Sequence, residues 1–509
     1  MPTLEAVRRP APALVPAVPS RVLPGWRALL LVVLVGAAGF VSFWRLGTAS
    51  WNTDELIYRN AGRGALSAAN REHPMLAKEL IDVSVERLGE GPAAGRLPSA
   101  LLGLATGAAL LAIGWRLAGF RVGAAAAALW WLLPQAPGVL EARITRYGML
   151  EPAMVCFGVL ALLAAWLAMT GRRPATAAAL AGLALGLSAS SKFTGALLGP
   201  AVLLAVALAP GPLPRRLGRV ALLGAGAVAG FLGPYVLAGG DWAGALGFAV
   251  RFQRNHAEVG HGIMVAGQLT YHPPWWATLW WQQTYLGVPG TAALWLDTMA
   301  GLTAVWRADR RAAAVLATAL LLPLAVLSLS PLQLPHYHLA LAAVQALVAG
   351  LGMTALWART GWRGGRHAAG GRPARRPRAA GAALAVALTA GLVPASAGLL
   401  TDVATLRPDG YRAAGEWLSA NGPRRPLVMV HGYRRVAAAY LPGAEVVSKP
   451  ARGVDAVMVD PFVAERSPGG PAARFVRTIS ASWEAHHFGR ITLWTRPREA
   501  TRAAAILRP

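Results

Sequence analysis

Residues 148–170 read GMLEPAMVCFGVLALLAAWLAMT, and Glu151 is the only charged side chain among them. A helix of roughly 20 apolar residues is long enough to cross the hydrocarbon core of a bilayer. A soluble core does not require an uninterrupted apolar run of this length. The segment therefore predicts a membrane-spanning helix that carries one carboxylate near its first turn.

The rest of the chain has the same character. Of its 509 residues, 55% are hydrophobic and 14% are charged, whereas soluble domains carry about 25% charged residues. We therefore predict an all-α polytopic membrane protein with about eleven transmembrane helices. The expected limits of the spans are 26–44, 96–117, 121–138, 148–170, 174–190, 194–210, 218–238, 286–304, 311–330, 337–357 and 379–400.

The positions of the basic residues predict an orientation. The net charge is +26, and short loops that are rich in Arg face the cytoplasm under the positive-inside rule. All the basic loops fall on one side, which we take as cytoplasmic together with the N-terminus. We find no nucleic-acid-binding motif and predict no nucleic-acid partner. The basic loops contain Arg116 and Arg121, Arg172 and Arg173, Arg215, Arg216 and Arg219, Arg307, Arg310 and Arg311, and the stretch 359–378.

Three regions follow from this pattern. Residues 1–25 are rich in Pro and Ala and are interpreted as a disordered cytoplasmic tail. Residues 26–400 form the membrane core, with two long external loops at 45–95 and 239–285. Residues 401–509 are less apolar, and we predict a small extracytoplasmic α/β domain there. Its expected elements are a helix at Tyr411–Asn421 and strands at Pro426–Val430, Ala456–Val459 and Ile491–Trp494.

Acids and cations gather where the loops expected outside the membrane meet the spans. Asp54 and Glu55 follow the first span, and Glu72 and His73 lie in the same loop. Helix capping would also explain a pair of loop acids, and snorkelling would explain interfacial Arg and Lys side chains. An ionisable group at membrane depth is nevertheless a functional candidate. The further candidates are Arg143, Arg146, Glu151 and Lys192.

Transfer of a sugar from a lipid phosphate would use such a set of residues. A carboxylate would take the proton from an acceptor hydroxyl. Cations would stabilise the phosphate leaving group, which gains charge in the transition state. Arg binds phosphate in a bidentate manner and Lys as a point charge. The lipid tail requires these groups to lie at the edge of the bilayer, where the candidates are found.

The motifs resemble those of the protein O-mannosyltransferase family, glycosyltransferase family 39, and its bacterial relatives. This family is a branch of the membrane-embedded C-type (GT-C) glycosyltransferases, to which the aminoarabinose transferase of lipid A is more distantly related. Order and spacing match from about residue 26 to 350. The matching motifs are Asp54-Glu55, Glu72-His73-Pro74-Met75-Leu76-Ala77-Lys78, Arg96-Leu97-Pro98-Ser99, Arg146-Tyr147-Gly148-Met149-Leu150-Glu151, residues 186–195 around Lys192, and Tyr271-His272-Pro273-Pro274-Trp275-Trp276.

The resemblance implies a GT-C-like fold and a role for each residue. Asp54 would be the catalytic base, supported by Glu55. Glu72 and His73 occupy the place of an acid or of a lipid-phosphate-binding group in relatives. Arg146 would bind the carrier phosphate together with Lys192. The remaining implied substrate-binding residues are Arg143, Glu151, His272, Trp275 and Trp276.

Two departures bear on the acceptor: loop 239–285 is too short for the family's extracellular sugar-binding-like domain, and residues 401–509 have no assigned counterpart in the family. Separately, Glu151 stands where the family usually has Asp, which keeps the charge but lengthens the reach. The resemblance implies an inverting mannosyltransferase that uses a polyprenyl-phosphate sugar donor in the cell membrane. The acceptor would be Ser or Thr of an exported protein. An aminoarabinose-transferase-like enzyme, or another sugar transferase acting on a glycolipid or a wall glycan, remains an alternative.

A second class of alternatives is not enzymatic. A transporter or flippase is expected to carry charges near mid-span, and many transporters contain internal repeats; we find few such charges and no repeat. A membrane scaffold leaves the acids and cations unexplained. No cofactor is predicted. Some C-type enzymes use a divalent cation, but the two imidazoles of His336 and His338 are spaced to point to different helix faces, and no metal site is expected.

Overall fold

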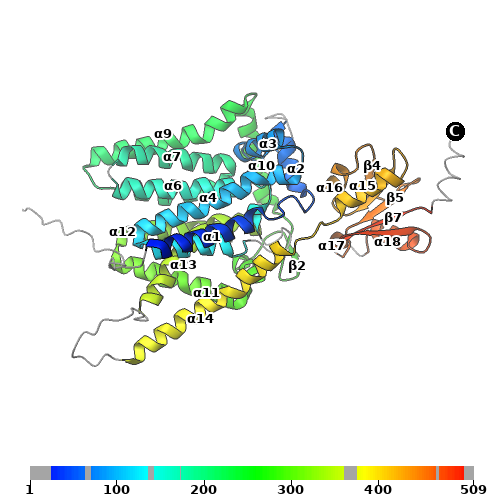
Figure 1. Ribbon diagram of the computed structural model, residues 1–509. Coiled ribbons are helices and arrows are strands. Elements are labelled where there is room, and N and C mark those ends of the chain that lie inside the picture. The colour runs from blue at the N-terminus through cyan, green and yellow to red at the C-terminus, as the bar shows by residue number, and fades with distance from the viewer. Residues whose placement is uncertain are drawn as a thin grey trace, which may run out of the picture.

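The computed structural model describes residues 24–63, 70–135, 143–171, 173–359, 375–465 and 469–497. A bundle of long helices forms most of the molecule, and a small α/β unit lies beyond one end of it (Figure 1). The tail predicted at 1–25 falls almost entirely outside the described residues. The chain is thus an all-α membrane core with a C-terminal sheet region, as the sequence predicts.

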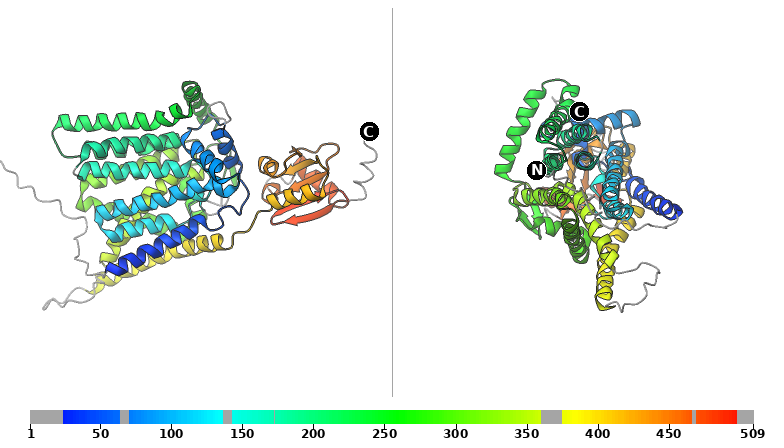
Figure 2. Two further views of the ribbon diagram at one scale, coloured as in Figure 1. Left: turned by 45° about the horizontal axis from the view of Figure 1, so that its top comes forward. Right: turned by 90° about the vertical axis from the view of Figure 1, so that its left-hand side faces the viewer.

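Long apolar helices make up the bundle. In the hydrocarbon core of a bilayer every backbone N–H and C=O group needs an internal partner, and an α-helix provides these hydrogen bonds within itself. Helices α1 and α14 lie along one flank in the left view of Figure 2 and pack together near one end through Val41, Leu399 and Val403. The helices of the bundle are α1 (Pro24–Phe43), α4 (Pro92–Ala118), α5 (Phe120–Leu132), α6 (Glu151–Thr170), α7 (Pro174–Ser191), α8 (Gly199–Ala207), α9 (Leu213–Ala238), α11 (Ala277–Ala308), α12 (Arg310–Leu329), α13 (Leu339–Arg359) and α14 (Arg375–Ala404).

Each predicted span falls on one of these helices. Within the described residues, eight helices are long and apolar enough to cross a membrane. Helix α5 and the segment Phe193–Ala207 are apolar but shorter. The span predicted at 121–138 extends too far at its C-terminal end, because α5 ends at Leu132. Leu133 is extended, since the residue before a proline, here Pro134, is disfavoured in the helical region.

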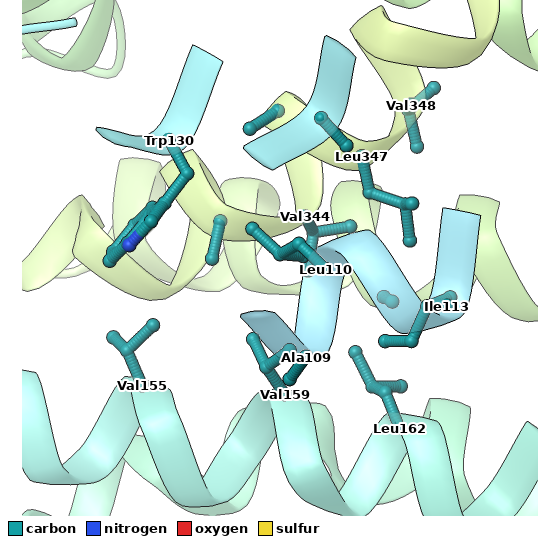
Figure 3. Close-up of a cluster of buried hydrophobic side chains, with 14 of the residues drawn as sticks. Ala109, Leu110, Ile113, Trp130, Val155, Val159, Leu162, Val344, Leu347 and Val348 are labelled. Carbon is teal, nitrogen blue, oxygen red and sulfur yellow. The ribbon is translucent and has the colours of Figure 1, made fainter. Parts of the chain in front are cut away.

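The core of the bundle is built from small and branched side chains. Figure 3 shows Ala109, Leu110 and Ile113 of α4 meeting residues of α5, α6 and α13, among them Trp130 and Val344. Glycines allow the helices to approach closely. A Cβ at Gly352 of α13 would lie 1.7 Å from the carbonyl oxygen of Asp297 on α11. Packing between small residues is the main attraction between helices within a bilayer.

The described parts of the loops predicted at 45–95 and 239–285 lie at the end of the bundle nearest the α/β unit (Figure 1). The first contains helices α2 (Thr53–Arg63) and α3 (Leu76–Leu88). The second contains α10 (Trp242–Val259) and the hairpin β1 (Ile263–Val265) and β2 (Gln268–Thr270). Both loops therefore form structure over the same end of the bundle.

The C-terminal unit contains a five-stranded sheet in the order β4-β3-β5-β7-β6. Strand β3 (Leu427–His431) pairs in parallel with β4 (Glu445–Val447) and β5 (Ala456–Val459). Strands β7 (Ile491–Thr495) and β6 (Glu484–Phe488) continue the sheet antiparallel. The strands and helix expected from the sequence are present, and β4 and β6 are additional. Helices α15 (Tyr411–Asn421), α16 (Arg434–Ala439), α17 (Pro461–Ala464) and α18 (Pro471–Ile479) accompany them.

Candidate active site

The first acidic pair lies in the opening turn of α2. The side chain of Asn52 accepts a hydrogen bond from the Asp54 backbone N–H at 2.9 Å, and the Asn52 N–H donates to Glu55 at 2.7 Å. This reciprocal arrangement is a capping box, which fixes where the helix starts. Because the cap makes this segment helical, the side chains of the consecutive residues Asp54 and Glu55 point in different directions.

Asp54 lies close enough to Glu151, Lys192 and His261 for their charges to act on its carboxyl group. Burial raises the pKa of Asp54, and the negative charge of Glu151 raises it further, while Lys192 and His261 act in the opposite direction. A carboxylate with a raised pKa is a better proton acceptor near neutral pH than an ordinary Asp. The environment of Asp54 therefore suits the role of a general base.

The carboxylate of Glu55 is hydrogen-bonded to other groups of the protein. Both of its oxygens accept hydrogen bonds from the buried Arg96 guanidinium at 2.8 and 2.9 Å. The Gly148 N–H donates a further bond at 2.8 Å. Arg96 also donates to the carbonyls of Leu46, Ala49 and Ser50. Glu55 and Arg96 together join α2, α4 and the loop before α6, which is a positioning role.

A buried ion pair joins the starts of two segments on the same side of the bundle. Glu151 at the first turn of α6 accepts from the Lys192 ammonium, which follows α7. The Lys192 ammonium also lies 3.6 Å from the centroid of the Tyr337 ring, and His336 Nε2 lies 3.6 Å from Glu151 Oε1. The second Glu151 oxygen is buried and has no hydrogen-bond partner among the described residues.

Glu72 and His73 belong to a turn that a buried lysine stabilises. Lys78 donates to the carbonyls of Asn70 and His73 at 2.9 and 2.8 Å. Burial lowers the pKa of Lys78 to about 8. Burial and the nearby Lys192 charge lower the pKa of His73 to about 3, so its imidazole is neutral. Glu72 accepts a hydrogen bond from Asn70 at 3.0 Å.

Arg143 and Arg146 are almost fully buried and bind backbone carbonyls. Arg146 donates to Val41 and Trp44 at the end of α1. Arg143 donates to the Trp131 carbonyl and, at 3.2 Å, to Thr145. Burial, with the neighbouring Arg146 charge, lowers the pKa of Arg143 to about 9. In this structure the two side chains tether helix ends, and Lys192 is the cation beside the acids.

The aromatic motif lies at the start of α11. Trp275 and Trp276 are exposed and line an apolar cavity of about 1030 Å³ between α11 and α12. Thr278 also lines this cavity and lies within 3.4 Å of the buried His338 imidazole. His272 is exposed and close to the hairpin, where its backbone contacts Thr270. The cavity thus approaches the segment that carries His336 and Tyr337.

The tertiary structure adds Tyr58, His336 and Tyr337 to the candidates. The ring of Tyr58 packs edge-on against His73 with centroids 6.3 Å apart. Burial raises the pKa of Tyr58 well above its usual range, and the carboxylates of Asp54 and Glu151 raise it further. The sequence signal for the other two was the polar His336-Tyr337-His338 triplet at the start of a span. No group of three or more metal-ligating residues was found in the part of the chain that the structure describes.

Comparison with solved structures identifies the fold. The chain has the fold of the C-type membrane glycosyltransferases. It superposes on ArnT from Cupriavidus metallidurans bound to undecaprenyl phosphate with a TM-score of 0.58 and 15% identity, covering 93% of this chain and 98% of that one. It also resembles the oligosaccharyltransferase AglB from Archaeoglobus fulgidus in complex with an inhibitory peptide and a dolichol-phosphate, with a TM-score of 0.54, 12% identity and coverages of 93% and 74%.

Sequence comparison gives the more particular assignment. Residues 72–233 match the family described as dolichyl-phosphate-mannose-protein mannosyltransferase. No curated protein sequence matches the chain. The resemblance to the protein O-mannosyltransferase-like branch is therefore confirmed, and the chain combines the fold of membrane glycosyltransferases with several apolar helices long enough to cross a bilayer.

Proposed function

We propose that this protein transfers a sugar, with mannose the preferred candidate, from a polyprenyl-phosphate carrier to an acceptor hydroxyl. The observation that carries the proposal is the cluster of Asp54, Glu151 and Lys192 at one end of the bundle. It combines a partly buried carboxylate suited to accept a proton with a buried cation suited to a phosphate. The proposed orientation puts this end, and residues 401–509, outside the cytoplasm, consistent with the basic loops at the opposite side.

In the proposed reaction the acceptor oxygen attacks the anomeric carbon of the donor. Its proton passes to the Asp54 carboxylate as the new carbon–oxygen bond forms. The bond between the anomeric carbon and the phosphate oxygen breaks, and its electron pair stays on the phosphate. Lys192 stabilises the charge that develops there. A single displacement of this kind inverts the configuration of the anomeric carbon.

The apolar cavity beside Trp275 and Trp276 supports a lipid-linked donor. The cavity has a volume of about 1030 Å³ and is lined mainly by Trp, Leu, Val and Ala side chains of α11, α12 and the residues just before α11. An isoprenoid chain bound there would lead its phosphate toward His336, Tyr337 and Lys192. The ArnT structure contains undecaprenyl phosphate and the AglB structure contains dolichol-phosphate, and a carrier of this class is proposed here.

Two classes of acceptor are proposed, and the first is Ser or Thr of an exported protein. A glycolipid or wall-glycan acceptor is the second candidate, because the chain matches 98% of the length of ArnT and 74% of that of AglB. The test is transfer by the purified protein in nanodiscs from polyprenyl-phosphate mannose to peptide, glycolipid and glycan acceptors. If the unchanged protein releases no sugar from any polyprenyl-phosphate donor, even to water, the proposed function is wrong.

A further inference from the structure

A second cavity lies between the first external loop and the C-terminal unit. Its volume is about 140 Å³, and its lining is more polar than apolar. Ser50, Asn52 and Thr53 line one side, while Tyr433, Phe462 and Arg490 line the other. None of these six residues belongs to the cluster that contains Asp54, Glu151 and Lys192.

The cavity lies at the carboxyl ends of two parallel strands. Tyr433 follows β3, and Phe462 follows β5. Strand β4 pairs on the other side of β3, so the connections leave the sheet in different directions at this point. In open α/β sheets, ligands bind in the crevice outside the carboxyl ends of strands where the strand order reverses. The C-terminal unit therefore presents its ligand-binding edge to the membrane core.

Buried hydrogen bonds hold the walls of the cavity in place. Asp460 is fully buried and accepts from Tyr411 at 3.0 Å and from Arg490 at 3.2 Å. Asp409 accepts from the Ser50 hydroxyl at 2.6 Å, which joins the C-terminal unit to the external loop. The backbone N–H of Trp51 donates to the Tyr440 hydroxyl at 3.1 Å. A cavity whose walls are already bonded needs little rearrangement to bind a ligand.

The chemistry of the lining fits a carbohydrate. Aromatic rings such as Phe462 and Tyr433 pack against the C–H face of a sugar ring, while the hydroxyls of the sugar need donors and acceptors. Ser50, Asn52 and Arg490 supply such groups. The cavity has room for about one sugar ring, and charges of both signs are present, which favours a neutral polyol over an anion.

We infer that this cavity is a saccharide subsite for the acceptor, which rests on the proposed function. The loop that forms its wall, Ser50 to Thr53, leads directly into Asp54, and Asn52 caps the turn on which Asp54 lies. A sugar bound there would hold a glycan-bearing acceptor beside the base without touching the reacting atoms. Its lining residues are positioning residues. This assignment favours a glycan or glycolipid acceptor over a bare peptide.

The test measures binding and transfer separately on the full-length protein in nanodiscs. Saturation-transfer NMR with the methyl glycosides of glucose, galactose, mannose and N-acetylglucosamine should detect binding of at least one. Phe462→Ala should weaken that binding about tenfold, whereas Phe462→Tyr keeps the aromatic face and should retain it. Phe475→Ala, a partly buried aromatic elsewhere in the same unit, is the matched control and should also retain it.

Kinetics complete the test. Phe462→Ala should raise the KM for a glycan-bearing acceptor about tenfold, whereas the control Phe475→Ala should leave that KM unchanged. Binding of a glycoside that Phe462→Ala weakens, without any donor turnover, would support the subsite and contradict the proposed function. Three outcomes, each observed together with donor turnover, would overturn the subsite alone. They are no glycoside binding, glycoside binding that is insensitive to Phe462→Ala, and an unglycosylated peptide that competes equally for the cavity.

Discussion

The ammonium of Lys192 lies between the Glu151 carboxylate and the face of the Tyr337 ring, whose centroid is 3.6 Å away. The three residues come from three separate parts of the bundle. A cation held by one carboxylate and one ring face keeps hydrogen-bonding capacity for a further anion. This arrangement is the structural basis for assigning Lys192 to the carrier phosphate.

Replacement of Lys192 should therefore weaken the use of the donor. Loss of one charge-assisted contact to phosphate predicts a rise in the donor KM of about tenfold or more in Lys192→Met. Removing one partner of a buried pair also costs stability, about 3–5 kcal/mol. The double variant Lys192→Met with Glu151→Gln keeps the pair neutral and serves as the folded control. An unchanged donor KM in that stable double variant would contradict the assignment.

Asp54→Asn should lose activity without losing stability. Removal of a general base costs about 10²–10⁴-fold in turnover. Because the folded protein raises the pKa of Asp54, ionisation at neutral pH costs stability, and the uncharged variant should unfold at the same or a higher temperature. Turnover and thermal unfolding are measured on the same preparation. Full activity in Asp54→Ala would exclude Asp54 as the base.

The pH profile should follow Asp54 and not His73. With a raised pKa, the Asp54 carboxylate becomes protonated at a higher pH than an ordinary Asp, so kcat/KM should fall on acidification from a correspondingly higher pH. The pKa of His73 is about 3, and its imidazole stays neutral throughout. His73→Asn should leave the midpoint of the acidic limb in place. Loss of that limb in His73→Asn would assign it to the imidazole instead.

Arg96→Met should destabilise the protein far more than loss of a surface pair. Arg96 is buried and satisfies Glu55 together with three backbone carbonyls, and breaking such a pair costs about 3–5 kcal/mol. Arg63, whose partners Asp82 and Glu90 are more exposed, is the matched control, with an expected cost of about 0–1 kcal/mol. Equal unfolding temperatures for Arg96→Met and Arg63→Met would show that the Glu55 network does not stabilise the fold.

Gly352→Ala tests the close contact of α11 and α13. A Cβ there meets the Asp297 carbonyl oxygen at 1.7 Å, and such overpacking costs about 1–3 kcal/mol. Gly224→Ala in α9 has nothing within 4 Å of the added carbon and should be neutral. Thermal unfolding of both variants in the same detergent makes the comparison. A neutral Gly352→Ala would mean that the two helices do not pack this closely.

The amino-acid sequence alone determined the membrane class, the approximate position of each span and the presence of a small α/β region. These properties depend on local hydropathy and periodicity, which a single segment carries by itself. Each predicted span falls on a helix, and the error at α5 arose because apolar residues continue past Leu132 while Pro134 favours an extended backbone before it. The gathering of the acids and cations at one end of the bundle also followed from local order along the chain.

Only the tertiary structure decided which of these charged groups meet. Glu151 and Lys192 are 41 residues apart in sequence, and Glu55 and Arg96 are also 41 apart. Successive side chains on a helix are rotated by about 100° around its axis. Which charged side chains pair therefore depends on the rotation and register of whole helices, and hydropathy does not specify these. For the same reason the sequence did not reveal that Arg146 binds the end of α1, or that the edge of the C-terminal sheet meets the loop before Asp54.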